Sequence, residues 1–166
     1  MLCVVARLIA VSTLVYSRNL LDEWNLSGIL QDSFIDDTTK LLLVEESNSF
    51  IQDIIKTEAL KTLTSVVSLD RPSKLNFVVN CLGANSYHGF MARMARICVD
   101  DLCSGRLGKP DCTSVAFCTA LFSLLYHMAG YDTGGEALLS CGLVGTLLSV
   151  VSCHSLALEH ITFVTR

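Results

Sequence analysis

Cysteine is the most reactive residue type that this chain contains in number. The spacing of the cysteines argues against a disulfide framework or a metal site. The 166-residue sequence has eight cysteines: Cys3, Cys81, Cys98, Cys103, Cys112, Cys118, Cys141 and Cys153. An even number is compatible with a disulfide framework, and thiolates also bind metals. However, no Cys-x-x-Cys pair occurs, and most cysteines lie among Leu, Val and Phe at helical spacing, where a reduced cysteine acts as a small apolar side chain. We expect reduced, structural cysteines; a disulfide protein or a metal-binding protein is the alternative.

The other reactive side chains form no recognisable catalytic constellation. The four histidines fit no zinc-binding spacing with the cysteines; they are His88, His127, His154 and His160. The acidic pairs Asp36-Asp37 and Asp100-Asp101 would not face one substrate, because adjacent positions on a helix diverge by ~100°. Gly134-Gly135 lacks the Gly-Lys-Ser/Thr ending of a phosphate-binding loop. We therefore predict no catalytic residue, no cofactor-binding residue and no metal ligand.

Helical periodicity dominates the sequence, and strand signals are weak. Helices are predicted over 2–16, 49–67, 74–82, 86–102, 114–130, 133–141 and 143–151, with a further helix beginning at 156. Shorter helical or irregular pieces, 25–33 and 39–46, surround an acidic turn at Asp36-Asp37. Capping-box spacing marks helix starts at Ser49 and Thr133, where a hydroxyl would satisfy unpaired backbone amides, and Ser86 is a further predicted cap. Pro72 ends the preceding helix, because proline cannot continue the hydrogen-bond ladder.

The apolar positions of two of these helices predict the core. In 49–67, one face carries Ile51, Ile54, Ile55, Ala59, Leu63, Val66 and Val67, and the opposite face carries Lys56, Lys61 and Ser65. In 86–102, the stripe consists of Tyr87, Phe90, Met91, Met94, Ile97, Cys98 and Leu102. Apolar residues at this spacing form one side of an amphipathic helix, so we expect both stripes to be buried.

Three segments of the chain share one order of features: an apolar helix with Ala-Leu or Ala-Val, a short helix, and a glycine followed by a further helix. They span about 2–46, 49–104 and 114–166. Their period exceeds the ~40–47 residues of armadillo or HEAT repeats, so insertions would be needed. Such helices bury their apolar faces against neighbouring repeats, which predicts an α-solenoid. Neither end carries a polar capping face, so we expect a single armadillo-like segment, 1–166, truncated at both ends.

The composition is unusually apolar, with 51% hydrophobic and 17% charged residues. It excludes a disordered chain, and the net charge of −4 disfavours nucleic acid as a partner. Two stretches without charged side chains, 112–131 and 137–158, reach the ~20-residue length of a membrane span. Hydroxyl residues interrupt both stretches, and neither has flanking tryptophan or basic belts. We therefore favour buried helices; a small polytopic helical membrane protein is the alternative.

Four longer strings point to a family. In chain order they are Leu63–Leu75, Ala84–Phe90, Thr119–Gly142 and Ile161–Arg166. Together they resemble the N-terminal armadillo-like region of the giant HECT-type E3 ubiquitin ligases that also carry UBA and WWE domains. The similarity runs from about Ala6 to Arg166 and is strongest over 57–90 and 119–143.

The resemblance implies an all-α, armadillo/HEAT-like α-solenoid fragment of about eight helices. Members of this family transfer ubiquitin through a thioester cysteine in a C-terminal HECT domain. None of the eight cysteines here corresponds to that residue, so no activity is expected of this chain itself. The resemblance implies a non-catalytic scaffold that supports substrate recruitment for ubiquitination. Its implied partners are ubiquitination substrates and neighbouring repeats of the parent chain, without cofactors, nucleic acid or membrane, in the cytoplasm or the nucleus.

Overall fold

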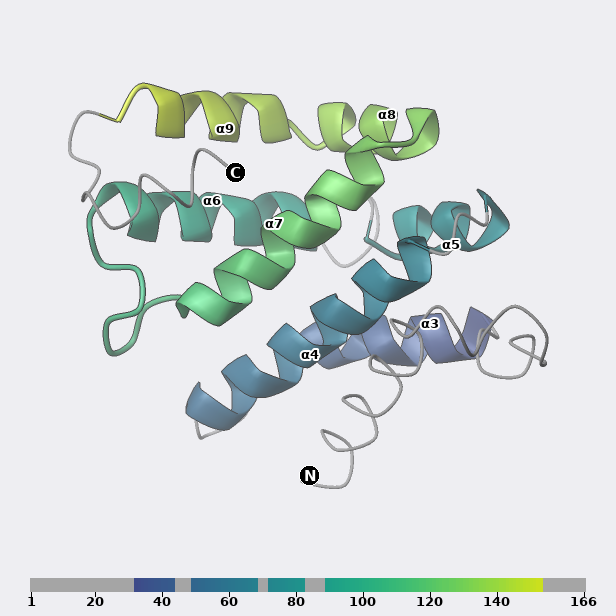
Figure 1. Cartoon of the computed structure of the whole chain (residues 1–166), viewed down its shortest axis with the longest axis horizontal. Coiled ribbons are helices and arrows are strands. Elements are labelled where there is room, and N and C mark those ends of the chain that lie inside the picture. The colour runs from purple at the N-terminus through teal and green to yellow at the C-terminus, as the bar shows by residue number, and fades with distance from the viewer. Residues whose placement is uncertain (1–31, 44–48, 69–71, 83–88, 154–166) are drawn as a thin grey trace.

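The computed structural model describes residues 32–43, 49–68, 72–82 and 89–153. In these ranges it contains α3 (Asp32–Lys40), the 3-10 helix η2 (Leu41–Leu43), α4 (Ser49–Val67), α5 (Pro72–Leu82), α6 (Phe90–Cys103), α7 (Val115–Ala129), α8 (Asp132–Ser140) and α9 (Leu143–Val151), and no strand (Figure 1). The all-α prediction is confirmed. The helices predicted over 2–16 and from 156 onward lie outside the described residues.

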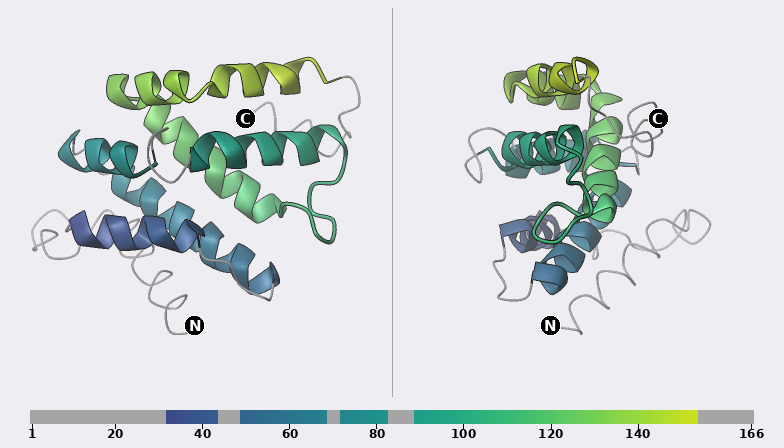
Figure 2. Two further views of the ribbon diagram at one scale, coloured as in Figure 1. Left: turned by 180° about the vertical axis from the view of Figure 1, so that it is seen from behind. Right: turned by 90° about the vertical axis from the view of Figure 1, so that its left-hand side faces the viewer.

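Three helices each pack against the helix three places further along the chain. α4 packs most extensively on α7, while α5 packs on α8 and α6 packs on α9. Figure 2 shows two layers: α4 and α7 lie side by side in one, and α3, the α5–α6 pair and the α8–α9 pair are stacked in the other. These packed pairs join corresponding places in two of the predicted segments, 49–104 and 114–166.

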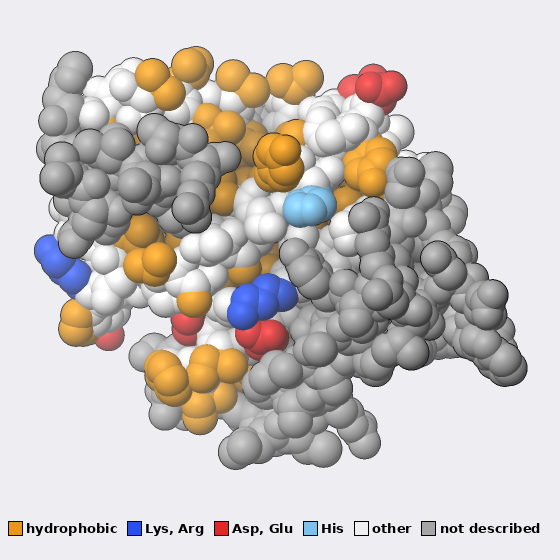
Figure 3. Space-filling view, viewed as in Figure 1, with side chains coloured by type: hydrophobic (Ala, Val, Ile, Leu, Met, Phe, Trp, Pro, Cys, Tyr) orange, Lys and Arg blue, Asp and Glu red, His pale blue; other side chains and the backbone are white. Residues whose placement is uncertain are grey.

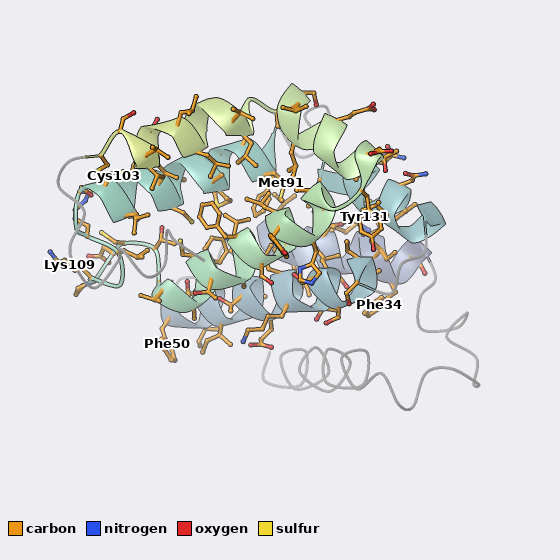
Figure 4. The ribbon with its side chains drawn as sticks, turned by 45° about the horizontal axis from the view of Figure 1, so that its top comes forward. Phe34, Phe50, Met91, Cys103, Lys109 and Tyr131 are labelled. Atoms are coloured by element: carbon orange, nitrogen blue, oxygen red, sulfur yellow. The ribbon has the colours of Figure 1, made fainter. Side chains whose placement is uncertain are left out.

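One apolar core joins the two layers. The Ala-Leu pairs that mark two of the predicted segments lie in it: Ala59 and Leu60 of α4 are fully buried, and Ala120 and Leu121 of α7 are at most 4% exposed. Met91 of α6 points into the same interior (Figure 4). Removing such side chains from water is the main favourable term in folding, at roughly 25 cal/mol per Å² of apolar surface.

Helix α4 is buried over more of its circumference than its sequence pattern predicts. Ser65, predicted on the polar outer face, is 2% exposed. The helix packs against α3, α5 and α7, so hydroxyl side chains also enter the interior. Thr64 Oγ1 donates to the Leu60 carbonyl at 2.8 Å, and Ser65 Oγ donates to the Lys61 carbonyl at 3.0 Å. Because each hydroxyl bonds to its own helix, it can be buried without a tertiary partner.

The acidic turn predicted at Asp36-Asp37 is instead the middle of α3. Lys40 Nζ lies 2.6 Å from Asp36 Oδ2 and 3.1 Å from Asp37 Oδ1. Pairs at these spacings, three and four residues apart, favour a helix. Ile35 beside them is fully buried, which anchors the helix to the core. The turn prediction was wrong because it considered the two acidic charges without the lysine that follows them.

Helix starts depart from the predicted positions at three places. The described part of α6 begins after Gly89, whose φ of +71° is a conformation that glycine tolerates; the predicted cap Ser86 lies outside the described residues. α8 begins at Asp132, so Thr133 lies inside the helix rather than at its cap. α5 begins at Pro72, because the first turn of a helix needs no backbone N–H from its proline.

The buried stripe of α6 also differs from the predicted one. Ile97, predicted in the core, is 39% exposed, whereas Ala95 and Val99 are at most 2% exposed. The other described members of the stripe except Met94 are buried as predicted: Phe90, Met91, Cys98 and Leu102. Because α6 packs on both α7 and α9, the neighbours decide which side chains are covered.

Candidate functional site

A buried acidic side chain, Asp101, lies near the end of α6. Its Oδ2 accepts hydrogen bonds from the backbone N–H of Thr113 at 2.9 Å and from the Thr113 hydroxyl at 2.8 Å. Its Oδ1 lies 3.4 Å from Arg106 Nη2. Asp101 is 6% exposed, whereas its neighbour Asp100 is exposed. The Asp101 carboxylate therefore anchors the loop between α6 and α7. Asp100 and Asp101 do not face one common ligand.

Replacing Asp101 by alanine should lower the free energy of unfolding by about 2–3 kcal/mol, because it removes a buried acceptor and leaves the Thr113 donors without their partner. Asp100→Ala is the matched control and should change the stability by less than ~0.5 kcal/mol. Urea denaturation followed by circular dichroism measures both. Equal losses in the two variants would contradict the role given to Asp101.

The hydroxyl of Ser114 and the imidazole of His127 secure helices. Ser114 Oγ accepts from the Phe117 backbone N–H at 3.0 Å, which caps α7, and donates to Asp53 Oδ2 of α4 at 2.7 Å. His127 Nδ1 lies 2.9 Å from the Ser123 carbonyl oxygen, one turn earlier in α7. These contacts tie α7 to α4 and to itself, and they do not assemble a catalytic triad.

The seven cysteines in the described ranges are thiols. Cys98 of α6 and Cys118 of α7 are fully buried. The hydrogen bond with Cys118, together with burial, raises the pKa of Cys98 far above its usual value. A thiol that stays protonated in an apolar interior is inert as a nucleophile. This pair therefore contributes packing between α6 and α7.

No group of three or more His, Cys, Asp or Glu side chains within the described ranges could hold a metal ion. A small cavity lies between α5, α6, α7 and α8. Its lining consists of Cys141 and apolar side chains that include Leu82, Met91 and Met128. Its volume of about 10 Å³ would hold at most one water molecule. A cavity of this size cannot admit a substrate.

The main group of exposed apolar side chains in the described residues follows α8 and α9. We call these residues the α9 face: Leu139, Val144, Leu147, Leu148 and Val151. Helix α9 contains no charged residue, and Figure 3 shows hydrophobic side chains along the upper edge of the molecule, where α9 lies in Figure 1.

Helix α9 resembles α6, but one of its apolar stripes is not covered by the neighbouring helices that the structure describes. Both helices follow a glycine with a φ of +71°, Gly89 before α6 and Gly142 before α9, and the corner predicted at Gly142 is confirmed. The second, sixth and ninth residues after the glycine are at most 2% exposed in α6: Met91, Ala95 and Cys98. The same positions of α9 are 49%, 59% and 79% exposed: Val144, Leu148 and Val151. A stripe that neighbouring helices cover on α6 is thus open on α9.

Among the described helices, none is both long and apolar enough to cross a membrane by itself. α8 and α9 reach the required length and composition only as a pair, and they are bent by 78° relative to each other. The uncharged stretch 112–131 forms α7, and half of that helix faces the core: Phe117, Cys118, Ala120, Leu121, Leu124, Leu125 and Met128 are buried. The membrane alternative is not supported.

These features define an all-α helical segment. No protein-family model and no solved structure matches it. The chain is 41% identical to the E3 ubiquitin-protein ligase HUWE1 of Mus musculus over 161 residues, which are 97% of this chain and 4% of that protein. Its identity to HUWE1 of Rattus norvegicus is also 41%, over 97% of this chain and 3% of that protein. The chain is therefore a relative of one short segment of a HECT E3 ubiquitin ligase, which confirms the resemblance.

Proposed function

We propose that this chain is a non-catalytic helical scaffold segment of a HECT-type E3 ubiquitin ligase, and that it supports the recruitment of proteins for ubiquitination. The observation that carries this proposal is the 41% identity to HUWE1 over 97% of the chain. A structural role is supported by the hydrogen bonds that Asp101 and Ser114 make within the fold, and by the buried, protonated thiol of Cys98. Such a segment would act in the cytoplasm or the nucleus, beside the proteins that the ligase modifies.

We further propose that the helices form an armadillo/HEAT-like solenoid. Packing of α4 on α7, α5 on α8 and α6 on α9 supports a stack that repeats every three helices. In a solenoid each repeat covers the next one. The open stripe on α9 would accordingly receive a neighbouring repeat of a longer ligase chain, as the equivalent stripe of α6 is covered here.

Two adjacent valines of α9 test this assignment of its faces. Val151 is 79% exposed, so Val151→Ser should leave the free energy of unfolding within about 0.5 kcal/mol and reduce self-association of the isolated chain. Val150 is 6% exposed, so the same replacement there should cost about 2 kcal/mol. Light scattering and urea denaturation measure the two effects. If Val151→Ser lowered the stability as much as Val150→Ser, the α9 face would be part of the core.

The absence of catalysis can be tested with the full chain, an E1 enzyme, an E2 enzyme, ATP and ubiquitin. We expect no ubiquitin adduct that a thiol reductant removes, because a HECT ligase must carry ubiquitin on a reactive cysteine. The isolated HECT domain of HUWE1 is the positive control. A reducible adduct on this chain that disappears on replacing one cysteine by serine would overturn the non-catalytic proposal.

A further inference from the structure

Two cysteines far apart in the sequence meet at the ends of stacked helices. Cys103 is the last residue of α6, and Cys153 lies two residues beyond the end of α9. They are 50 residues apart, yet Cys153 Sγ donates a hydrogen bond to the Cys103 carbonyl oxygen at 3.6 Å. Figure 4 shows Cys103 at the end of α6, next to the end of α9. The sulfur atom of Cys153 is thus held against the backbone of the residue that carries the other thiol.

The environment of this pair differs from that of the other close cysteine pair. Cys103 and Cys153 are each partly exposed, whereas Cys98 and Cys118 are fully buried. Burial, followed by the hydrogen bond with the Cys153 thiol, raises the pKa of Cys103 to about 11. At neutral pH Cys103 is therefore a protonated thiol in contact with its neighbour. A small oxidant can reach this pair from solvent, while the interior pair is shielded from it.

We infer that Cys103 and Cys153 form an oxidisable pair that reacts with hydrogen peroxide and closes to a disulfide between α6 and α9. The Cys153 thiol loses its proton to water, and the resulting thiolate attacks one peroxide oxygen. The O–O bond breaks, and the products are a sulfenic acid on Cys153 and hydroxide, which takes up a proton. The Cys103 sulfur then loses its proton to water and attacks the Cys153 sulfur. The S–S bond forms, the S–O bond breaks, and a second water leaves. Two thiols are oxidised by two electrons, and one peroxide is reduced to two waters.

The location of the pair gives this modification a structural consequence. The disulfide would close a loop that contains α7, α8 and α9, and it would fix α9 in its place on α6. Cross-linking residues 50 apart restricts the unfolded chain strongly. Thiol reductants would reverse the bond by exchange. Oxidation by peroxide would thus stabilise the packing of α9 on α6.

The test treats the full chain with stoichiometric hydrogen peroxide, blocks the remaining thiols, and maps the peptides without reduction. We expect one main linked pair, Cys103 with Cys153, and a rise in Tm of about 5–10 °C that dithiothreitol reverses. Cys153→Ser and Cys103→Ser should each abolish the rise. Cys141→Ser, which replaces another partly exposed cysteine, should retain it.

Three outcomes would overturn the inference. The first is a linkage between other cysteines as the main product. The second is oxidation of Cys103 and Cys153 to sulfinic acids without a linked peptide. The third is a peroxide-dependent rise in Tm that persists in Cys153→Ser. Each can be read from the same digests and melting curves.

Discussion

Replacing Gly134 by alanine should destabilise the fold by about 3 kcal/mol or more. Gly134 is buried in the first turn of α8, immediately after the end of α7. A Cβ atom at this position would lie 2.1 Å from the carbonyl oxygen of Met128 and 2.8 Å from its carbonyl carbon. These atoms are backbone atoms of α7, so no rotamer change can relieve the overlap. The expected readout is a lower urea midpoint with an unchanged slope.

The neighbouring Gly135 provides the control for this prediction. A Cβ atom there would meet no atom within 4 Å. Because alanine stabilises a helix interior relative to glycine, Gly135→Ala should raise the free energy of unfolding by about 0.5–1 kcal/mol. The two substitutions add the same methyl group at adjacent positions of one helix. If they change the free energy of unfolding in opposite directions, the loss at Gly134 can be attributed to the close contact between α7 and α8. A stabilising effect of Gly134→Ala would contradict the packing of these helices.

Leu121→Ala should cost about 3–4 kcal/mol, because it removes a fully buried side chain from the helix that packs most extensively on α4. Both the lost apolar burial and the remaining cavity contribute to this cost. Leu139→Ala is the matched control, since Leu139 is 64% exposed on the α9 face. Its effect should stay below ~0.5 kcal/mol. Chemical denaturation of both variants gives the comparison, and similar losses would mean that the α4–α7 contact is not the centre of the core.

Local chemistry accounts for the parts of the fold that the sequence predicts well. Ser114 before α7 supplies a hydroxyl for an unpaired amide, and the left-handed backbone at Gly142 turns α8 into α9. α4 ends at Val67, before Pro72, which is the first residue of α5. Each signal acts within a few residues of its own position, so it can be read without knowledge of the neighbours.

The features that escaped prediction depend on contacts between distant parts of the chain. Ser65 is buried because three helices surround α4, and Ile97 is exposed because of where α7 and α9 lie on α6. Asp101 shows no sequence signal that separates it from Asp100, since its role arises only when the loop brings Thr113 to it. The pairing of Cys103 with Cys153 likewise needs the stacking of α6 and α9, which cysteine spacing does not encode.

The most direct test of the scaffold proposal is an exchange within HUWE1. The segment of HUWE1 that matches this chain would be replaced by this chain, and ubiquitin transfer to a substrate of that ligase would be measured beside the intact ligase and a version lacking the segment. The scaffold account predicts that the deletion loses substrate ubiquitination, that the exchange restores most of it, and that an exchange carrying Gly134→Ala does not. Two results would contradict the account. In the first, the exchange variant is folded but ubiquitinates the substrate no more than the deletion variant does. In the second, the deletion has no effect on substrate ubiquitination.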